Sequence, residues 1–397
     1  MTAHVLRGDA RNLPLPDGSV DLIVTSPPYF ALRSYTDGGA HYPGQIGSES
    51  TPAEWLDALL ECTAEWVRVL KPEGNLFVNL GDKYDAGTDS PRRVPGDLNW
   101  IRKASSPRGT TGCPKSLLGL PWRYAHGCTD QLGLILRAEI IWAKPNGLPE
   151  SVTDRVRRAH EQVFHFTRQP RYYAAVDEIR EPHQPQSVAR TQRNRFAPDL
   201  SQPAWGSPNT LNPADACNPL GKLPGSVWEI PSSPVQVPER VGVDHFAAFP
   251  PALVRPIVLG WSPPGVCTAC GHSRRPVVEG GHNGDGAKAH KAAMRVASFN
   301  WAAWKASEPH RIIGYACACP QPDAPTQPSI VLDPFGGTGT TALVATAYGR
   351  HGITVDLSAD YCRLAHWRVN DPGERARARA MPKPPPIPDG MEPLFTM

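Results

Sequence analysis

A glycine-rich loop between an apolar run and a helix pattern is the feature that most limits the fold of this 397-residue chain. The apolar residues 330–332 lead into residues 333–341, Asp-Pro-Phe-Gly-Gly-Thr-Gly-Thr-Thr, and residues 342–347 continue as a helix pattern. Glycines at that point let a ligand approach the backbone and open the helix N-terminus toward it. A second apolar run follows and ends in Asp356. This order of strand, loop, helix and strand predicts an α/β sheet.

The ligand expected at this loop is nucleoside-like. The loop lacks the Gly-Lys-Ser/Thr of phosphate loops, which disfavours a nucleoside triphosphate. A carboxylate at the end of the next strand, here Asp356, suits a ribose diol. A nicotinamide dinucleotide fold would also place an acidic residue there. However, the loop spacing departs from G-x-G-x-x-G, and few strand-helix elements remain after it.

A stiff polar turn follows an apolar run near the other end of the chain. Residues 20–24 predict a buried strand, and residues 25–29 read Thr-Ser-Pro-Pro-Tyr. The two prolines fix two φ angles and remove two N–H donors, so the chain leaves the sheet with carbonyls facing outward. With the Ser26 hydroxyl and the Tyr29 ring, such a turn suits a planar base that carries an exocyclic amine. Alone, the five residues fit an ordinary turn equally well.

Together the two motifs resemble the β-group amino DNA methyltransferases, which use S-adenosylmethionine. In that family a D/N/S-P-P-Y/F/W tetrapeptide is catalytic, and a D-P-F-x-G-x-G-T loop holds the methionine part of the cofactor. The catalytic motif comes first here, as in the β-group. The resemblance therefore implies a permuted Rossmann-like α/β sheet, with a catalytic half at 1–180 and a cofactor-binding half at 329–370. It places catalysis at Ser26, Pro27, Pro28 and Tyr29.

Further segments extend the resemblance along the chain. Residues 5–10 resemble the opening strand of the family, whose carboxylate lies near the adenosine, and residues 139–146 resemble the strand and loop beside the target base. Residues 241–261 contain the helix that leads to the cofactor half, with Phe249 where many relatives have lysine. The resemblance places the cofactor at Asp9, Phe249, Asp333, Phe335, Gly337, Gly339, Thr340 and Asp356.

Proline is abundant, at 45 residues, and predicts long irregular connections around the core. We expect solvated excursions for residues 84–116 and a mobile tail for 371–397. Residues 181–240 are rich in Pro, Gln and Asn, and β-group relatives place recognition elements between these motifs. This segment is therefore predicted to be the DNA target-recognition insertion. Its clustered arginines suit phosphates or guanine edges, and they are Arg190, Arg193 and Arg195.

The nine cysteines are an odd number in a chain without a secretory signal, so disulfides are not expected. Four of them form a C-x2-C pair and a C-x-C pair inside an insertion at 262–328. Two such pairs can supply four thiolates to a tetrahedral structural zinc ion, with His272 as a substitute for one of them. Unpaired thiols in a loop are the alternative. The predicted ligands are Cys267, Cys270, Cys317 and Cys319.

Composition sets further limits. A net charge of +3 with a pI near 8.4 permits a polyanionic partner without establishing one. No run of 18 apolar residues occurs, and the N-terminus lacks a charged start followed by an apolar stretch. A membrane span and a secretory signal are therefore not expected, and a cytoplasmic location is predicted.

The reaction expected is direct methyl transfer to an exocyclic amine. Acceptors at Ser26 and the Pro27 carbonyl favour a pyramidal amine nitrogen with an available lone pair. Methylation at carbon 5 of cytosine needs a cysteine nucleophile, and no cysteine adjoins the Pro-Pro turn. The resemblance associates Ser in the first motif position with cytosine N4, and adenine N6 stays open.

Two other classes remain. An RNA methyltransferase would need no DNA-recognition insertion. An inactive zinc-bearing nucleic-acid binder would be expected to have lost Asp333, a loop glycine or the proline pair, and all of these are present. The expected partner is double-stranded DNA. A cognate restriction endonuclease would fit a restriction-modification system, and a phage or orphan enzyme fits equally well.

Overall fold

The structure is a computed structural model, and it divides into two compact units that are described separately. Unit 1 comprises residues 1–174, 226–266 and 327–397, and unit 2 comprises 175–225 and 267–326. The residues that the structure describes are 3–31, 36–37, 40–41, 44–85, 113–147, 149–187, 218, 220–235, 237–238, 241–243, 248–278, 311–317, 319–321 and 324–382.

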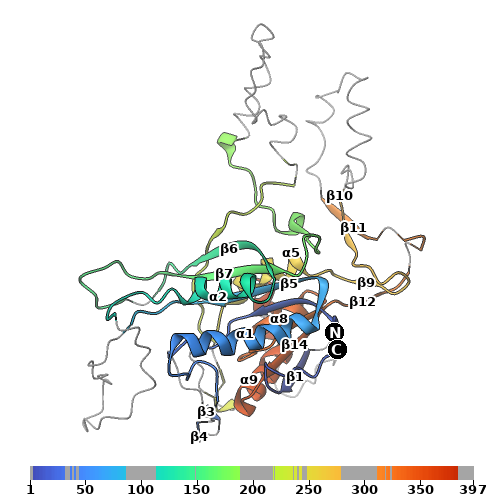
Figure 1. The fold of residues 1–397 in the computed structure, drawn as a ribbon. Coiled ribbons are helices and arrows are strands. Elements are labelled where there is room, and N and C mark those ends of the chain that lie inside the picture. The colour runs from blue at the N-terminus through green and yellow to red at the C-terminus, as the bar shows by residue number, and fades with distance from the viewer. Residues whose placement is uncertain are drawn as a thin grey trace, which may run out of the picture. The chain divides into compact units, whose positions relative to one another are not determined.

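Within the described residues, unit 1 is built on an eight-stranded sheet in the order β1-β14-β13-β2-β5-β7-β6-β8 (Figure 1). The first five strands are parallel, β7 is antiparallel to both β5 and β6, and β8 is parallel to β6. The mostly parallel α/β sheet predicted from the motif order is confirmed. The strands are β1 Ala3–Arg7, β2 Val20–Thr25, β5 Leu70–Leu80, β6 Ile135–Ala143, β7 His160–Thr167, β8 Val227–Glu229, β13 Ile330–Asp333 and β14 His351–Asp356.

Helices cover both faces of this sheet, which explains why every residue of the central strand β2 is buried. One apolar cluster packs α1 and α2 against one face, and a second packs α5, α8 and α10 against the other. None of the described helices has the length and hydropathy that a membrane crossing needs. The helices are α1 Pro52–Val69, α2 Leu120–Asp130, α5 Pro251–Trp261, α8 Thr340–Ala347, α9 Ala359–Asn370 and α10 Pro372–Ala378.

Local hydrogen bonds fix the start of helix α1. Thr51 accepts a hydrogen bond from the Glu54 backbone N–H at 3.2 Å, and the Glu54 carboxylate accepts the Thr51 N–H at 3.1 Å. This reciprocal capping box, with Pro52 in the first turn, satisfies N–H groups that would otherwise lack partners. The buried face of the helix then presents Trp55 and Trp66 to the sheet.

A buried carboxylate ties the two motif-bearing strands together. Asp21 in β2 accepts the Ile330 backbone N–H at 2.8 Å and pairs with the Lys71 ammonium of β5 at 2.7 Å. Burial raises the pKa of Asp21, and the neighbouring Lys71 opposes that rise. One side chain thus contacts the starts of β13 and β5 on either side of its own strand.

The predicted recognition insertion ends earlier than residue 240. Residues 227–229 form β8 and pair with β6, so the chain has already returned to the sheet. Unit 2 instead joins residues 175–225 with residues 267–326. From the sequence, two separate insertions were predicted in these parts of the chain. The expected excursion at 84–116 is closed at its base by two backbone hydrogen bonds, from the Asp85 N–H to the Ser116 carbonyl and from the Lys115 N–H to the Asp85 carbonyl. Residues 86–112 lie outside the described residues.

The prediction of a mobile tail from residue 371 was wrong for its first part. Asp371 caps α10 by accepting the Glu374 N–H at 2.9 Å, and Ala378 is fully buried against the second apolar cluster. An Arg/Ala-rich composition suggested a solvated tail, but small alanines allow close packing on α8. Residues 383–397 lie outside the described residues.

Small elements complete the described chain. In unit 2, strands β10 and β11 form an antiparallel pair, and the chain between β7 and β8 contains a short 3-10 helix, η1. Two further two-stranded pairs join β3 to β4 and β9 to β12. Their bounds are β3 Thr36–Asp37, β4 Ala40–His41, η1 Val176–Ile179, β9 Val266–Cys267, β10 Arg275–Val278, β11 Ile312–Ala316 and β12 Thr326–Gln327.

A buried histidine should make the fold sensitive to acid. His165 in β7 stacks on Phe77 at 4.2 Å and bonds Asn75, and burial lowers its pKa to about 3. Between pH 6.5 and 3 the unfolded chain binds a proton there that the folded chain does not. The free energy of unfolding should therefore fall by up to about 1.4 kcal/mol per pH unit as the pH drops. Urea unfolding across this range should show a shallower slope for His165→Gln, and equal slopes would contradict this account. The same change at exposed His126 is the matched control.

Candidate active site

The two sequence motifs meet because β2 and β13 are neighbouring parallel strands. Leu22 pairs with Val331 and Ile23 pairs with Leu332, so the Ser-Pro-Pro-Tyr turn and the glycine-rich loop leave the sheet at the same edge. Ligands of open α/β sheets bind at the carboxyl ends of the strands. The candidate site is therefore built from segments at opposite ends of the chain.

A single cavity at this edge is lined by residues of both motifs. Ser26 and Pro28 of the first motif face it, together with Phe335 and Gly337 of the glycine-rich loop. Asp9 after β1 and Asp356 at the end of β14 also line it. The six residues were predicted from the sequence for two different tasks, catalysis and cofactor binding. Because they line one cavity, a substrate and a cofactor bound by these residues would be adjacent.

Polar contacts fix the aromatic ring of the first motif. The Tyr29 hydroxyl donates to the Glu161 carboxylate at 2.7 Å and accepts from the Asn79 amide at 2.9 Å. The same amide lies 3.2 Å from the Ser26 hydroxyl and 2.7 Å from Glu161. Lys144 completes the cluster through an ion pair with Glu161. Tyr29 is thus held in one orientation before any ligand arrives.

Backbone packing also holds the turn. A side chain at Gly81 would meet the Tyr29 ring at 2.6 Å, so the ring lies flush against the strand end. The Pro28 carbonyl accepts the Trp55 indole N–H at 3.1 Å. Among the described residues no donor bonds the Pro27 carbonyl. Of the two carbonyls, the one expected to face the substrate amine is therefore available.

The glycine-rich loop turns through two left-handed residues. Gly337 has φ +48° and Gly339 has φ +72°, a region that other residues adopt at a cost. Gly339 is the N-cap of α8, and a side chain there would meet Ala365 at 2.9 Å. The Gly337 N–H donates to Asp356 at 2.8 Å. Asp356, at the end of β14, therefore supports the loop and also lines the cavity.

Asp333 shapes the loop from beneath. Its carboxylate accepts the Phe335 N–H at 3.1 Å and the Thr341 hydroxyl at 3.0 Å. It is 1% exposed, and it is not among the residues that line the cavity. Complete burial raises the pKa of Asp333 to about 7, although the bonds from Thr341 and Phe335 oppose the rise. Asp333 therefore supports the backbone of the loop from outside the cavity, and its role toward the cofactor stays a prediction.

An arginine that the sequence analysis missed supports the same loop. Arg368 on α9 is 1% exposed, and its guanidinium donates to the hydroxyls of Thr338 at 2.8 Å and Thr340 at 2.6 Å. Its other side pairs with Glu374 at 2.6 Å. The predicted cofactor residue Thr340 is therefore buried and used inside the protein. The helical spacing of Leu364 and Arg368 places both on one face, which was the available signal.

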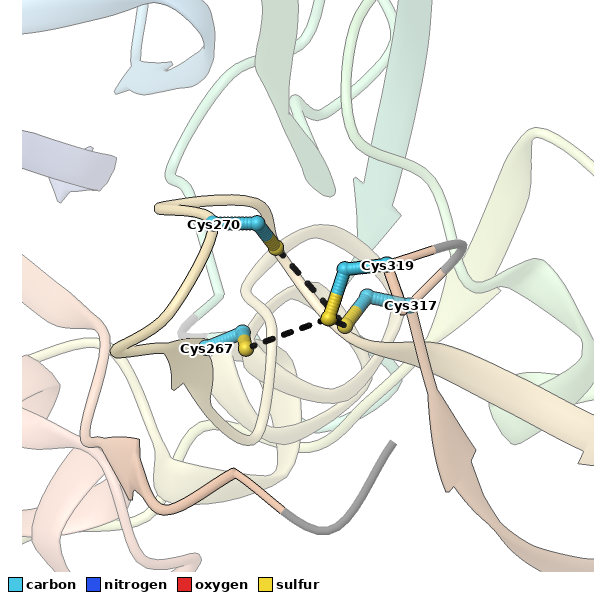
Figure 2. Close-up of side chains that lie close together, drawn as sticks. All are labelled: Cys267, Cys270, Cys317 and Cys319. Atoms are coloured by element: carbon cyan, nitrogen blue, oxygen red, sulfur yellow. Dashed lines mark hydrogen bonds between the residues drawn. The ribbon is translucent and has the colours of Figure 1, made fainter. Parts of the chain in front are cut away.

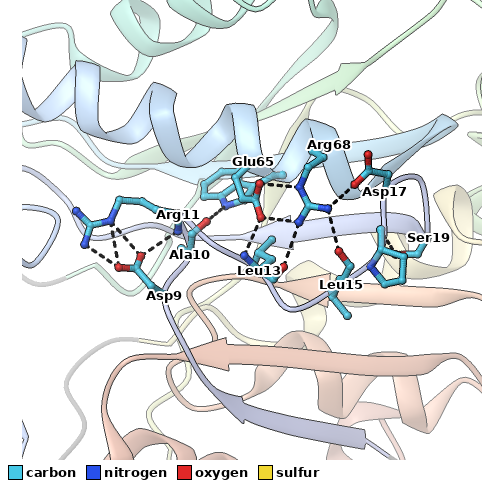
Figure 3. A network of polar contacts seen from close by, with 11 residues as sticks. Asp9, Ala10, Arg11, Leu13, Leu15, Asp17, Ser19, Glu65 and Arg68 are labelled. Carbon is cyan, nitrogen blue, oxygen red and sulfur yellow. Dashed lines mark hydrogen bonds and ion pairs between the residues drawn. The ribbon is translucent and has the colours of Figure 1, made fainter.

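Helix α1 positions Asp9 at the cavity. Arg68 donates to the Leu13 and Leu15 carbonyls of the loop that links β1 to β2, and Glu65 pairs with Arg68 at 2.7 Å (Figure 3). Asp9 itself pairs with Arg11 at 2.7 Å. The hydrogen bond from Arg11 lowers the pKa of Asp9. An ionised acceptor next to the cavity suits hydroxyl or amine donors of a nucleoside.

The remaining predicted residues fall in several places. Phe249 lies two residues before α5 and, with Asn79, bounds a second narrow cavity. Pro27 is buried in the turn. The arginines expected to contact DNA, Arg190, Arg193 and Arg195, lie outside the described residues.

The four predicted zinc ligands are brought together in unit 2. The sulfur atoms of Cys267, Cys270, Cys317 and Cys319 all lie within 4.8 Å of one another (Figure 2). His272 does not belong to this group, and its imidazole bonds the Cys270 carbonyl at 2.9 Å. The alternative in which His272 replaces a cysteine is therefore not favoured.

Comparison with known proteins identifies the family. The family model N6_N4_Mtase, a DNA methylase, matches residues 20–268 and 312–366. The chain is also 35% identical over 371 residues to the Type II methyltransferase M.XycI of Xanthomonas campestris pv. cyanopsidis, a match that spans 92% of this chain and 87% of that protein. This chain belongs to the N6_N4 DNA methylase family. The β-group resemblance of its motifs is thereby confirmed.

Two further similarities accompany this match. The Type II methyltransferase M.Cfr9I of Citrobacter freundii is 35% identical over 269 residues, covering 66% of this chain and 74% of that protein. Among solved structures, the cytosine-N4-specific PvuII DNA methyltransferase aligns over 94% of this chain and 83% of its own, with 16% identity and a TM-score of 0.47. By its family, the chain is a DNA methyltransferase that acts on an amino group.

The loop support of this methyltransferase can be tested at Arg368. Arg368→Lys keeps the charge but cannot reach Thr338, Thr340 and Glu374 together. We expect the free energy of unfolding to fall by about 1–3 kcal/mol and the dissociation constant for S-adenosylmethionine to rise. Urea unfolding and calorimetric titration measure the two effects. Arg363→Lys, an exposed change on the same helix, is the matched control, and equal behaviour of the two variants would contradict the assigned role.

Proposed function

We propose that this DNA methyltransferase transfers a methyl group from S-adenosylmethionine to the N4 amine of a cytosine turned out of double-stranded DNA. The observation that carries the proposal is the shared cavity, in which Ser26 and Pro28 stand beside Phe335, Gly337 and Asp356. When bound, S-adenosylmethionine supplies an electrophilic methyl group on a sulfonium. The loop and Asp356 suit its amino-acid and ribose parts, and the proline turn suits the base.

The turn supplies acceptors where the amine needs them. The Ser26 hydroxyl and the Pro27 carbonyl accept the two amine hydrogens, which favours a nitrogen whose lone pair points at the methyl carbon. The nitrogen–carbon bond then forms as the carbon–sulfur bond breaks, the electron pair stays on sulfur, and the amine proton leaves to solvent. The fixed Tyr29 ring receives the base by stacking. Orientation of the two reactants accounts for most of the acceleration.

Cytosine N4 is proposed over adenine N6 because the motif opens with Ser26. In the β-group the serine form is associated with cytosine, and Asp or Asn with adenine. A neutral hydroxyl offers one acceptor oxygen, and here it also contacts Asn79 at 3.2 Å. Adenine N6 methylation on the same site is the second candidate, and RNA methylation and an inactive nucleic-acid binder are the further ones.

The cofactors and partners follow from this function. S-adenosylmethionine is required, whereas a zinc ion held by four cysteines would take no part in the transfer, because it has no open position. A DNA substrate is consistent with a cytoplasmic location. We propose that the enzyme protects DNA against a cognate restriction endonuclease, since the relatives M.XycI and M.Cfr9I are named Type II methyltransferases.

Stacking on Tyr29 gives a sharp test of the turn. Tyr29→Ala should lower kcat/KM for DNA by about 5–150-fold, because base–aromatic stacking contributes about 1–3 kcal/mol. The dissociation constant for S-adenosylmethionine should stay unchanged, because Tyr29 does not line the cavity shared with the loop. Tyr29→Phe keeps the ring and loses the contacts of the hydroxyl with Glu161, Asn79 and Ser26, so its kcat/KM should lie between those of the wild type and Tyr29→Ala. Methyl-transfer assays with titrated DNA measure kcat/KM for both variants. A lower kcat/KM for Tyr29→Phe than for Tyr29→Ala would overturn the stacking role.

The activity and the base are tested together in cells. Plasmid DNA from a methylation-deficient host that expresses the chain should carry N4-methylcytosine in one short sequence motif, read by single-molecule sequencing. Asp333→Ala should erase this signal, because it removes the acceptor that holds Phe335 and Thr341.

The other outcomes separate the alternatives. N6-methyladenine in place of N4-methylcytosine would transfer the assignment to adenine. Absence of any modified DNA, with S-adenosylmethionine bound by the purified protein, would refute DNA methylation and favour RNA. Modification that survives Asp333→Ala would show that another enzyme made it.

A further inference from the structure

We propose that Cys267, Cys270, Cys317 and Cys319 bind one zinc ion that keeps unit 2 folded, and that unit 2 is the part of this methyltransferase that grips DNA. The second half of the proposal rests on the proposed function. The metal would control DNA binding and leave the cofactor cavity of unit 1 intact. Binding of S-adenosylmethionine therefore reports on unit 1, and binding of DNA reports on unit 2.

The spacing of the sulfur atoms fits a single tetrahedral metal. Zinc–thiolate bonds of about 2.3 Å place tetrahedral sulfur atoms about 3.8 Å apart. The measured separations are 3.9 Å for Cys267–Cys319, 3.8 Å for Cys270–Cys317 and 3.5 Å for Cys317–Cys319. The first two separations each join a cysteine of one pair to a cysteine of the other pair. Figure 2 shows all four side chains turned toward one centre.

The backbone around the first pair is shaped as a metal-binding knuckle. The Cys267 N–H donates to the His272 carbonyl at 3.0 Å, and the Gly271 N–H donates back to the Cys267 carbonyl at 2.9 Å. Gly271 has φ +70°, which lets the chain reverse directly after Cys270. Thr268 bonds the Pro325 carbonyl at 2.9 Å, so the turn is also fixed to the chain that follows the second pair. Both pairs are therefore held in place for a common ion.

The described residues of unit 2 form no apolar core. Buried apolar side chains there are limited to Ala175 and Cys267, and neither apolar cluster of the protein includes a residue of this unit. On β11, Ile313 is 58% exposed and Tyr315 is 36% exposed. Strands and turns that share few buried apolar contacts, as in the described part of unit 2, are commonly held by a cross-link such as a structural metal. The four thiolates provide it.

Charge and contacts connect the metal unit to DNA. Unit 2 carries 12 Lys and Arg against 9 Asp and Glu, so it holds the whole +3 excess of the chain. The segment 175–225, which contains the clustered arginines, belongs to the same unit as the cysteines, and the Tyr315 hydroxyl on β11 donates to Glu178 in that segment. Loss of the metal should therefore disturb both stretches together and weaken the hold on phosphates.

The metal is tested on the full-length protein. Elemental analysis of protein purified without chelators should give about one zinc per chain, and cobalt-substituted protein should show the visible absorption of a tetrahedral thiolate site. Cys270→Ser and Cys317→Ser should lose the metal. Cys113→Ser, at an exposed cysteine outside the cluster, is the matched control and should keep it. Iron in place of zinc, no metal in the wild type, or zinc retained by both cluster variants would overturn the site.

The role of the metal is tested by two binding measurements on the same proteins. Equilibrium dialysis with S-adenosylmethionine should give equal affinity for the wild type and the cluster variants, which also shows that unit 1 is folded. Filter binding with sonicated unmethylated bacterial DNA should show a loss of roughly tenfold or more for the cluster variants only.

Each remaining outcome has one meaning. Zinc lost with DNA binding unchanged would overturn the role in DNA binding, and zinc lost together with S-adenosylmethionine binding would overturn its confinement to unit 2. A wild type that binds zinc but neither S-adenosylmethionine nor DNA would refute the proposed function, and with it the assignment of unit 2 to DNA, while leaving the metal site standing.

Discussion

The parallel pairing of β13 with β2 is the interaction on which the site depends. It sets the glycine-rich loop and the Ser-Pro-Pro-Tyr turn at one edge of the sheet, although the two lie at opposite ends of the chain. Asp21 reinforces the pairing by accepting the first N–H of β13 from inside β2. A shift of one residue in this register would exchange the side chains that face the two helical layers, so the position of the site is fixed as firmly as the core.

A layer of buried polar groups connects the sheet to the ligand-facing backbone. Asp333 and Arg368 hold the glycine-rich loop from below, and Asn79 and Glu161 hold Tyr29 from the side. These groups are costly to bury unless their partners are in place. The bonds that these groups make also hold the loop and the turn in place, and among them the Asn79 side-chain oxygen alone has no partner in the described part of the chain. The site is thus rigid for the same reason that its polar interior is stable.

The sequence predicted what depends on local pattern and missed what depends on register. Apolar runs before a proline turn or a glycine loop identified β2 and β13, and the family resemblance placed them in one site. Asn79 and Glu161 meet only because β5 and β7 pair antiparallel, with Leu80 opposite Gln162, and no local signal sets that register. Arg368 and Arg363 are five residues apart on α9, yet one is buried and the other exposed. Helical spacing separates the two positions, whereas the residue type is the same at both.

The pairing of β1 with β14 has a consequence for the order in which the protein is made. Residues 3–7 find their sheet partner only after residues 351–356 have been synthesised, and the glycine-rich loop leaves the ribosome shortly before that partner. The strands of the catalytic half are complete much earlier and must wait with one edge of the sheet open. In a growing chain the Ser-Pro-Pro-Tyr turn therefore stands without the glycine-rich loop for most of synthesis. The sheet edge that carries both motifs is completed in one late step, when β13 and β14 join the earlier strands.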